Sequence, residues 1–162
     1  MHFPIFATAL ALISSTVAIP NYGLAPRQAA TLDAAMKARG RSYIGTSLTI
    51  RNDNTEQNTI KSEFGSITPE NAMKWDSTEP NQNQFNLGGG DQIANWATQN
   101  NKQMRCHTLV WYSQLPGWVN NINNNATLIS VMENHIKTLM TRWKGKCTHW
   151  DVVNEGMWRI LE

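Results

Sequence analysis

The sequence predicts an α/β fold in which about four strand–helix units form part of a (β/α)8 barrel, also called a TIM barrel. Helical and strand-like patterns alternate along the chain, which indicates parallel strands joined by right-handed crossovers. Polar and aromatic residues follow the carboxyl ends of successive predicted strands, where a barrel builds its active site. No glycine-rich phosphate-binding turn follows any of these strands, so a doubly wound nucleotide-binding sheet has little support.

Eight elements are expected, and glycine or proline marks the ends of several of them. The strands are predicted at residues 43–50, 66–69, 103–111 and 148–153. The helices are predicted at residues 29–39, 55–64 and 127–144, and in a segment that begins with Asp91 as N-cap and includes Ile93, Trp96 and Ala97. Gly40 and Gly145 follow predicted helices, and Pro69 ends the second strand.

The clearest helix is the one predicted at residues 127–144. Apolar residues recur there at spacings of three and four, which gathers them on one side of a helix. They are Leu128, Met132, Ile136, Leu139, Met140 and Trp143. We therefore expect this stripe to be the buried face of the helix.

The N-terminal segment differs from the rest of the chain. Residues 3–13 form an apolar run that is too short to span a bilayer, since a span needs about 20 residues. The run fits the apolar region of a secretory signal, with Thr16-Val17-Ala18 as the cleavage site. We expect residues 1–18 to be a signal peptide, residues 19–27 a short pro-segment and residues 28–162 the folded part of a secreted, extracellular protein.

Charge and composition limit the kinds of partner. The 162 residues include 14 Lys and Arg against 12 Asp and Glu, and no basic cluster for nucleic acid is visible. No metal-ligand cluster is apparent, and no cofactor or membrane partner is expected. Charged residues make up only 16% of the chain, while seven tryptophans and many amides are present. This composition suits a sugar-polymer ligand, but it equally suits a neutral secreted surface with tryptophans in the core.

Two cysteines and one glycosylation sequon are relevant in a protein that is secreted. A disulfide between Cys106 and Cys147 is possible, but we place the two cysteines on neighbouring strands at different heights. We therefore expect their Cα atoms to lie beyond the limit of ~7 Å for a disulfide. Asn125 begins the sequence Asn-Ala-Thr, which is a glycosylation acceptor and predicts a surface loop.

Three segments carry candidate chemistry, and each lies at the end of a predicted strand. They are residues 68–75 (TPENAMKW), 107–116 (HTLVWYSQLP) and 150–155 (WDVVNE). In this order and spacing they closely resemble the ends of the second, third and fourth strands of the family 10 glycoside hydrolases, which are endo-1,4-β-xylanases. The resemblance covers roughly residues 28–155 and implies the first four βα units, about half of the catalytic domain.

The resemblance implies hydrolysis of internal β-1,4-xylosidic bonds in xylan with retention of configuration. Glycosidic hydrolysis needs a proton for the leaving oxygen, and Glu155 is the implied proton donor and general acid/base. An aromatic, partly desolvated rim around Trp111 would favour the protonated acid that this role requires. Asn154 is expected to bind the sugar 2-hydroxyl. The other implied substrate-binding residues are Glu70, Asn71, Lys74, His107, Trp111 and Gln114. Without the motif, Glu70 and Lys74 would be an ordinary i,i+4 surface pair.

Several features depart from the family. Tyr112 stands where the family usually has His, and Cys106 where Gly is common. The family's nucleophilic glutamate lies on a seventh strand, which is absent here, and the residues after Glu155 do not resemble the family's continuation. We therefore expect a truncated fragment that lacks the nucleophile and self-associates, although the full-length enzyme would be monomeric. Two other interpretations stay open: a non-catalytic carbohydrate-binding fragment, or an interaction protein whose barrel is completed by a second chain.

Overall fold

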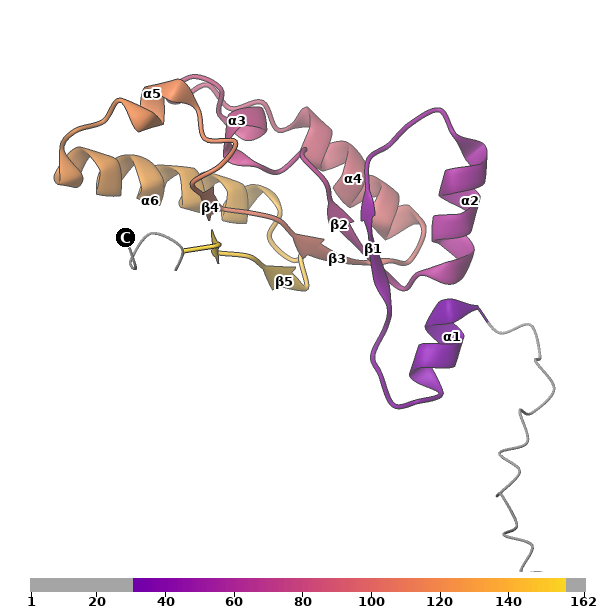
Figure 1. Cartoon of the computed structure of the whole chain (residues 1–162). Helices are drawn as coiled ribbons and strands as arrows, with labels where there is room; N and C mark the ends of the chain where they lie inside the picture. The colour runs from indigo at the N-terminus through magenta and orange to yellow at the C-terminus, as the bar shows by residue number, and fades with distance from the viewer. Residues whose placement is uncertain (1–30, 157–162) are drawn as a thin grey trace, which may run out of the picture.

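The computed structural model describes residues 31–156 (Figure 1). Four strands form a parallel sheet in the order β1 (Gly45–Leu48), β2 (Ser66–Pro69), β3 (Gln103–Cys106) and β5 (His149–Trp150). Two further strands, β4 (Val110–Trp111) and β6 (Val153–Asn154), pair in parallel beyond the ends of β3 and β5. The order of strands follows the order of the chain, as successive βα units require.

The helices connect these strands and gather largely on one side of them (Figure 1). They are α1 (Leu32–Lys37), α2 (Asn54–Glu63), α3 (Trp75–Thr78), α4 (Gly88–Gln99), α5 (Gly117–Asn120) and α6 (Asn125–Arg142). The main core lies between the sheet and the long helices, where Ile67 and Met104 of the strands meet Ile93 and Leu139 of the helices. Burial of these apolar side chains is the main stabilising contribution to such a layered fold. The sheet and helices therefore form part of a (β/α)8 barrel, as the sequence predicts.

The third and fourth predicted strands are each interrupted. Residues 103–111 form β3 and β4, with a cis peptide bond between His107 and Thr108, and residues 148–153 form β5 and β6. Backbone hydrogen bonds continue across the interruption: Asp151 N donates to the Cys106 carbonyl at 3.0 Å, and Leu109 N donates to the Asp151 carbonyl at 2.9 Å. The two interrupted strands thus turn together, which keeps their carboxyl ends adjacent.

Helix α4 begins earlier than the sequence predicts. Asp91 is not its N-cap, because the three glycines before it belong to the helix. Gly90 has a packing role: a Cβ atom there would lie 2.3 Å from Cζ2 of Trp143. The Asp91 carboxylate instead accepts hydrogen bonds from Trp143 Nε1 at 3.0 Å and Arg142 Nε at 2.9 Å, which joins α4 to the end of α6.

The buried face of α6 is rotated relative to the predicted stripe. Its buried residues are Val131, His135 and Leu139, at spacings of four, and the buried Trp143 follows at the C-cap. Met140, which the pattern placed on the buried face, is 44% exposed. The prediction was right for Leu139 and Trp143 and wrong for Met140, and it missed His135 because it grouped residues by hydrophobicity.

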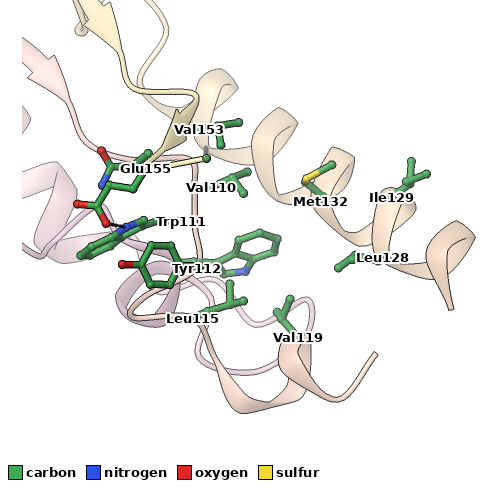
Figure 2. A pocket seen from close by; sticks show the side chains of 13 residues that line it. Val110, Trp111, Tyr112, Leu115, Val119, Leu128, Ile129, Met132, Val153 and Glu155 are labelled. Atoms are coloured by element: carbon green, nitrogen blue, oxygen red, sulfur yellow. Dashed lines mark hydrogen bonds between the residues drawn. The ribbon is translucent and has the colours of Figure 1, made fainter. Parts of the chain in front are cut away.

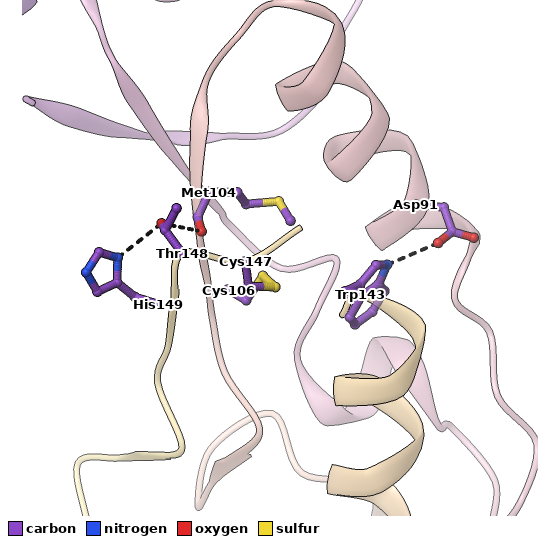
Figure 3. Close-up of a disulfide and its surroundings, with 7 residues drawn as sticks. All are labelled: Asp91, Met104, Cys106, Trp143, Cys147, Thr148 and His149. Atoms are coloured by element: carbon purple, nitrogen blue, oxygen red, sulfur yellow. Dashed lines mark hydrogen bonds between the residues drawn. A yellow bond between two sulfur atoms is a disulfide. The ribbon is translucent and has the colours of Figure 1, made fainter. Parts of the chain in front are cut away.

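Cys106 and Cys147 are joined by a disulfide, and their Cα atoms lie 5.6 Å apart (Figure 3). The expectation that these Cα atoms lie too far apart for a disulfide was wrong, because Cys147 does not belong to a strand. It lies in the connection between α6 and β5, and the following residue, Thr148, donates from its backbone N to the Met104 carbonyl at 2.8 Å. From this connection the side chain of Cys147 reaches the fully buried Cys106 and packs against the main core.

Two further expectations concern the surface. Asn125 is exposed, but it is the first residue of α6 rather than part of a loop. No helix within residues 31–156 is long and apolar enough to cross a membrane. The predicted signal peptide and pro-segment lie outside the described residues.

Candidate functional site

The predicted site residues gather where the strands end. Glu70 and Asn71 follow β2 directly, Trp111 is the last residue of β4, and Asn154 is the last residue of β6. Trp111 and Asn154 are partners in the β4–β6 register. Carboxyl ends of parallel strands share one edge of a sheet, so residues far apart in the sequence meet there.

One polar cluster joins the segments after β2 and β4. Lys74 is 9% exposed, and its Nζ donates to Asn71 Oδ1 at 2.9 Å and to Gln114 Oε1. Gln114 Nε2 also donates to Asn71 Oδ1 at 3.3 Å. Lys74 therefore pairs with two amides and not with Glu70, so the simple surface pair is not formed. Amides and an ammonium held together offer donors and acceptors to a ligand rich in hydroxyl groups.

Lys74 also links this cluster to the aromatic part of the site. Its Nζ lies 4.9 Å from the centre of the Trp111 ring, within the range of a cation–π interaction. Trp111 in turn donates from Nε1 to Oε2 of Glu155 at 2.8 Å. A continuous chain of contacts thus runs from Asn71 through Lys74 and Trp111 to the proposed acid.

Two site residues have unusual backbone conformations. Gln114 has φ of 46° and Glu155 has φ of 52°, both in the left-handed region that non-glycine residues seldom occupy. Such conformations cost free energy and tend to be retained at functional sites. Glu155 is exposed, so among the described residues the expected enclosure of this acid is not present.

His107 is held by an acidic residue to which the sequence assigned no role. Its Nδ1 lies 2.8 Å from Oδ2 of Asp151, and Arg105 Nη2 lies 2.6 Å from the other oxygen, Oδ1. Burial raises the pKa of Asp151, but the hydrogen bonds from Arg105 and His107 outweigh this effect and lower the pKa below its usual value. The ionised carboxylate therefore fixes the orientation of the imidazole.

Glu70 is engaged by two residues that follow β1. Its carboxylate accepts a hydrogen bond from Thr49 Oγ1 and one from Arg51 Nη2 at 3.1 Å. The hydrogen bond from Thr49, followed by the charge of Arg51, lowers the pKa of Glu70 despite some desolvation. Glu70 is thus held ionised as an acceptor, which suits binding to sugar hydroxyls.

Two cavities meet at Asn154. The first, of about 320 Å³, is a groove between β4, β6, α5 and α6, with Glu155 at one end (Figure 2). Its walls are aromatic and apolar, and include Trp75, Trp111, Tyr112, Leu115, Met132 and Val153. The second, of about 350 Å³ and here called the polar cavity, has charged and polar residues in its lining, among them Glu70, Arg105, His107, Asp151 and Asn154. The structure therefore brings every predicted site residue to this region, with Asn71, Lys74 and Gln114 joined to it through Trp111.

Three residues of this site were missed from the sequence: Asp151, Arg105 and Arg51. Asp151 lies inside one of the three segments, directly before Val152, yet nothing in its spacing indicates contact with His107, 44 residues away. Arg51 precedes the second helix and resembles any exposed cation.

Tyr112, which replaces a family histidine, packs edge-on to Trp111 with ring centres 5.9 Å apart and is 56% exposed.

The arrangement is suited to binding a polar ligand with apolar faces and to moving a proton. Within residues 31–156, no cluster of three or more His, Cys, Asp or Glu side chains is arranged to hold a metal ion. Stacking surfaces, amides and a carboxyl group at the ends of parallel strands are typical of the carbohydrate-active enzymes with a (β/α)8 fold.

Comparison with known proteins supports this class. Residues 31–159 match the model of glycosyl hydrolase family 10. Endo-1,4-beta-xylanase B of Humicola insolens is 70% identical over 77% of this chain and 35% of its own length. Endo-1,4-beta-xylanase 2 of Aureobasidium pullulans is 54% identical over 97% of this chain and 45% of its own. The structure of Penicillium canescens endo-1,4-beta-xylanase XylE superposes with a TM-score of 0.73 at 37% identity, over 77% of this chain and 39% of that one.

The chain therefore belongs to glycosyl hydrolase family 10. It spans less than half the length of the relatives that it matches.

Proposed function

We propose that residues 31–156 are part of an endo-1,4-β-xylanase that hydrolyses internal β-1,4-xylosidic bonds of xylan with retention of configuration, and that hydrolysis needs a second carboxylate that none of these residues supplies. The observation that carries the proposal is the chain of contacts from Asn71 through Lys74 and Trp111 to Glu155. This chain of contacts supports the proposal that the sugar-binding groups and the proton donor lie on one rim. Relatives named as endo-1,4-beta-xylanases at 70% and 54% identity support xylan as the substrate.

In this proposal Glu155 protonates the leaving glycosidic oxygen and later deprotonates the attacking water. Asn154 binds the 2-hydroxyl of the sugar beside the scissile bond, a contact that strengthens in the transition state. Glu70, Asn71, Lys74, His107 and Gln114 bind neighbouring sugar hydroxyls, and Trp111 stacks on a sugar ring. Asp151 supports this set by holding His107.

A retaining mechanism needs a second carboxylate about 5–5.5 Å from the acid. Glu70 and Asp151 are the acidic residues of the polar cavity, and both are already paired, with Arg51 and with Arg105 and His107 respectively. We assign neither as the nucleophile. A site with bound sugar and a proton donor but no nucleophile binds without turnover, so non-catalytic carbohydrate binding is the second candidate function.

The apolar surface near the edge of the sheet is also consistent with a barrel that is completed by a second chain. Val152, Val153 and Ile129 are each at least half exposed there.

We further propose secretion into an extracellular environment, with residues 1–18 as signal peptide, residues 19–27 as pro-segment and a glycan on Asn125. The disulfide between Cys106 and Cys147 is compatible with an oxidising compartment.

Xylan binding is tested by titrating the purified chain with xylotetraose and, as the specificity control, with cellotetraose, using calorimetry. We expect binding of xylotetraose that Asn71→Ala weakens. Asn58→Ala serves as the matched control, because Asn58 is an exposed residue of α2 that lines neither cavity. Equal affinities for both sugars, or equal affinities of the two variants for xylotetraose, would reject xylan binding at this rim.

A further inference from the structure

A buried acid–base pair lies behind the rim, outside the residues assigned so far. Glu79 is 1% exposed and His135 is fully buried, and Oε2 of Glu79 lies 2.8 Å from Nδ1 of His135. Such a pair is costly to bury and contributes little net stability compared with well-packed apolar side chains. Its presence therefore calls for a role other than holding the core together.

Glu79 connects four segments of the chain. Its Oε2 accepts a hydrogen bond from Trp75 Nε1 at 3.1 Å, and its Oε1 accepts one from Asn83 N at 2.9 Å. Its backbone carbonyl accepts a hydrogen bond from Trp118 Nε1 at 3.1 Å. Together with His135, these partners come from α3, the loop after it, α5 and α6.

Glu79 contacts the indole N–H of Trp75, and His135 contacts its ring face. The two rings stack with centres 4.0 Å apart and planes 12° apart. Burial lowers the pKa of His135, although Glu79 and the backbone of Leu109 favour the charged ring, so the imidazole is neutral near neutral pH. A neutral ring donates from Nδ1 to Glu79 and leaves Nε2 without a hydrogen-bond partner among the described residues.

Trp75 connects the Glu79–His135 pair to the residues of the rim. It is the first residue of α3, directly after Lys74, and it lines the apolar groove. The next residue, Asp76, donates from its backbone N to the Gln114 carbonyl at 3.2 Å. The backbone of α3 therefore connects Trp75 to both Lys74 and its partner Gln114, and we expect a displacement of Trp75 to be transmitted along it.

We propose that Glu79 and His135 are positioning residues: they fix Trp75 by its N–H and its face, and thereby hold Lys74 over Trp111 in the geometry that binds xylan. The sugar-binding part of this inference rests on the proposed function. The positioning part rests on the contacts alone. The pair touches no sugar and takes no part in proton transfer to the substrate.

The test uses the 162-residue chain with ¹⁵N-labelled tryptophan, and compares His135→Gln and Glu79→Gln with the control Leu139→Val. Leu139 is a fully buried residue of the same helix that packs in the main core, away from the cluster that contains Trp75. We measure the indole N–H resonance of Trp111, the affinity for xylotetraose and the thermal midpoint of each variant. Both pair variants should shift the Trp111 resonance and weaken binding by about fivefold, the equivalent of one polar contact.

The control should lower the thermal midpoint without either of these effects. If the Glu79 and His135 variants do not fold, Trp75→Phe removes the N–H bond to Glu79 while keeping a ring against His135, and the same shift is expected. Folded variants with an unchanged Trp111 resonance would overturn the inference. A wild-type chain that binds no xylotetraose would reject the proposed function, while the Trp111 resonance still decides the positioning role.

Discussion

The indole N–H of Trp111 donates a 2.8 Å hydrogen bond to Oε2 of Glu155, a residue 44 positions further along the chain. The pairing of Trp111 with Asn154 in the β4–β6 register brings the two together. Trp111 thus touches Glu155 on one side and Lys74 on the other. The orientation of Glu155, the proposed acid, therefore depends directly on the aromatic residue that we propose stacks on the sugar.

The role of Glu155 is tested in a chimera in which residues 31–155 replace the matching segment of Humicola insolens endo-1,4-beta-xylanase B. Glu155→Gln should leave xylan binding intact and lower kcat by about 10²–10⁴-fold, since only proton delivery is removed. The loss should be smaller for aryl xylosides with good leaving groups, which need little protonation. Glu133→Gln, at an exposed position of α6, is the control. Near-full activity of Glu155→Gln on xylan would contradict the assignment.

For the chain by itself, we expect residues 28–162 to show no detectable hydrolysis of xylan at any pH. No described residue is assigned as the second carboxylate, so the covalent intermediate of a retaining mechanism should not form. Reducing-sugar release from xylan is the measurement. An activity that survives repurification and disappears in Glu155→Ala would show that another carboxylate acts as nucleophile.

The disulfide should contribute to stability. It closes a loop between residues 41 positions apart and joins β3 to the end of the α6–β5 connection. By restricting the unfolded chain it should add about 2–4 kcal/mol to the free energy of unfolding. Urea unfolding of the oxidised protein and of the Cys106→Ala, Cys147→Ala double variant measures the difference. A reducing agent should lower the stability of the oxidised protein and leave the stability of the double variant unchanged.

Stability should also depend on pH through His135. Burial holds its pKa below the ordinary value of 6.5, so the unfolded chain binds this proton at a higher pH than the native protein does. The contribution of the neutral buried ring is therefore complete above about pH 6.5 and is lost as the pH falls below that value. Some carboxyl groups, such as those of Asp91 and Glu70, have a lowered pKa in the native protein. They make the stability depend on pH only below their usual pKa values of 3.8 and 4.5.

Urea unfolding between about pH 5 and pH 7.5 measures this dependence. The free energy of unfolding of the native chain should decrease toward the acid end of the range. His135→Gln should be less stable throughout but should show a flatter pH dependence. Parallel curves for the two proteins would show that His135 does not contribute.

The fold and most of the site were predictable because both depend on local patterns and on chain order. Alternating elements imply a parallel sheet, and residues that follow parallel strands must meet at one edge. Glu70, Trp111 and Asn154 could therefore be placed together from their positions after strands. The short strand β2 was predicted with its observed bounds, because Gly65 and Pro69 mark them.

Contacts between distant segments were decided by the tertiary structure. Asp151 orients His107, and Glu79 pairs with His135, only because the strands turn together and α6 packs behind the rim. The disulfide depends on the path of the connection that contains Cys147, which follows no periodic pattern. Hydrophobic periodicity determines which elements form, whereas buried polar pairs depend on the distance between side chains that only packing sets.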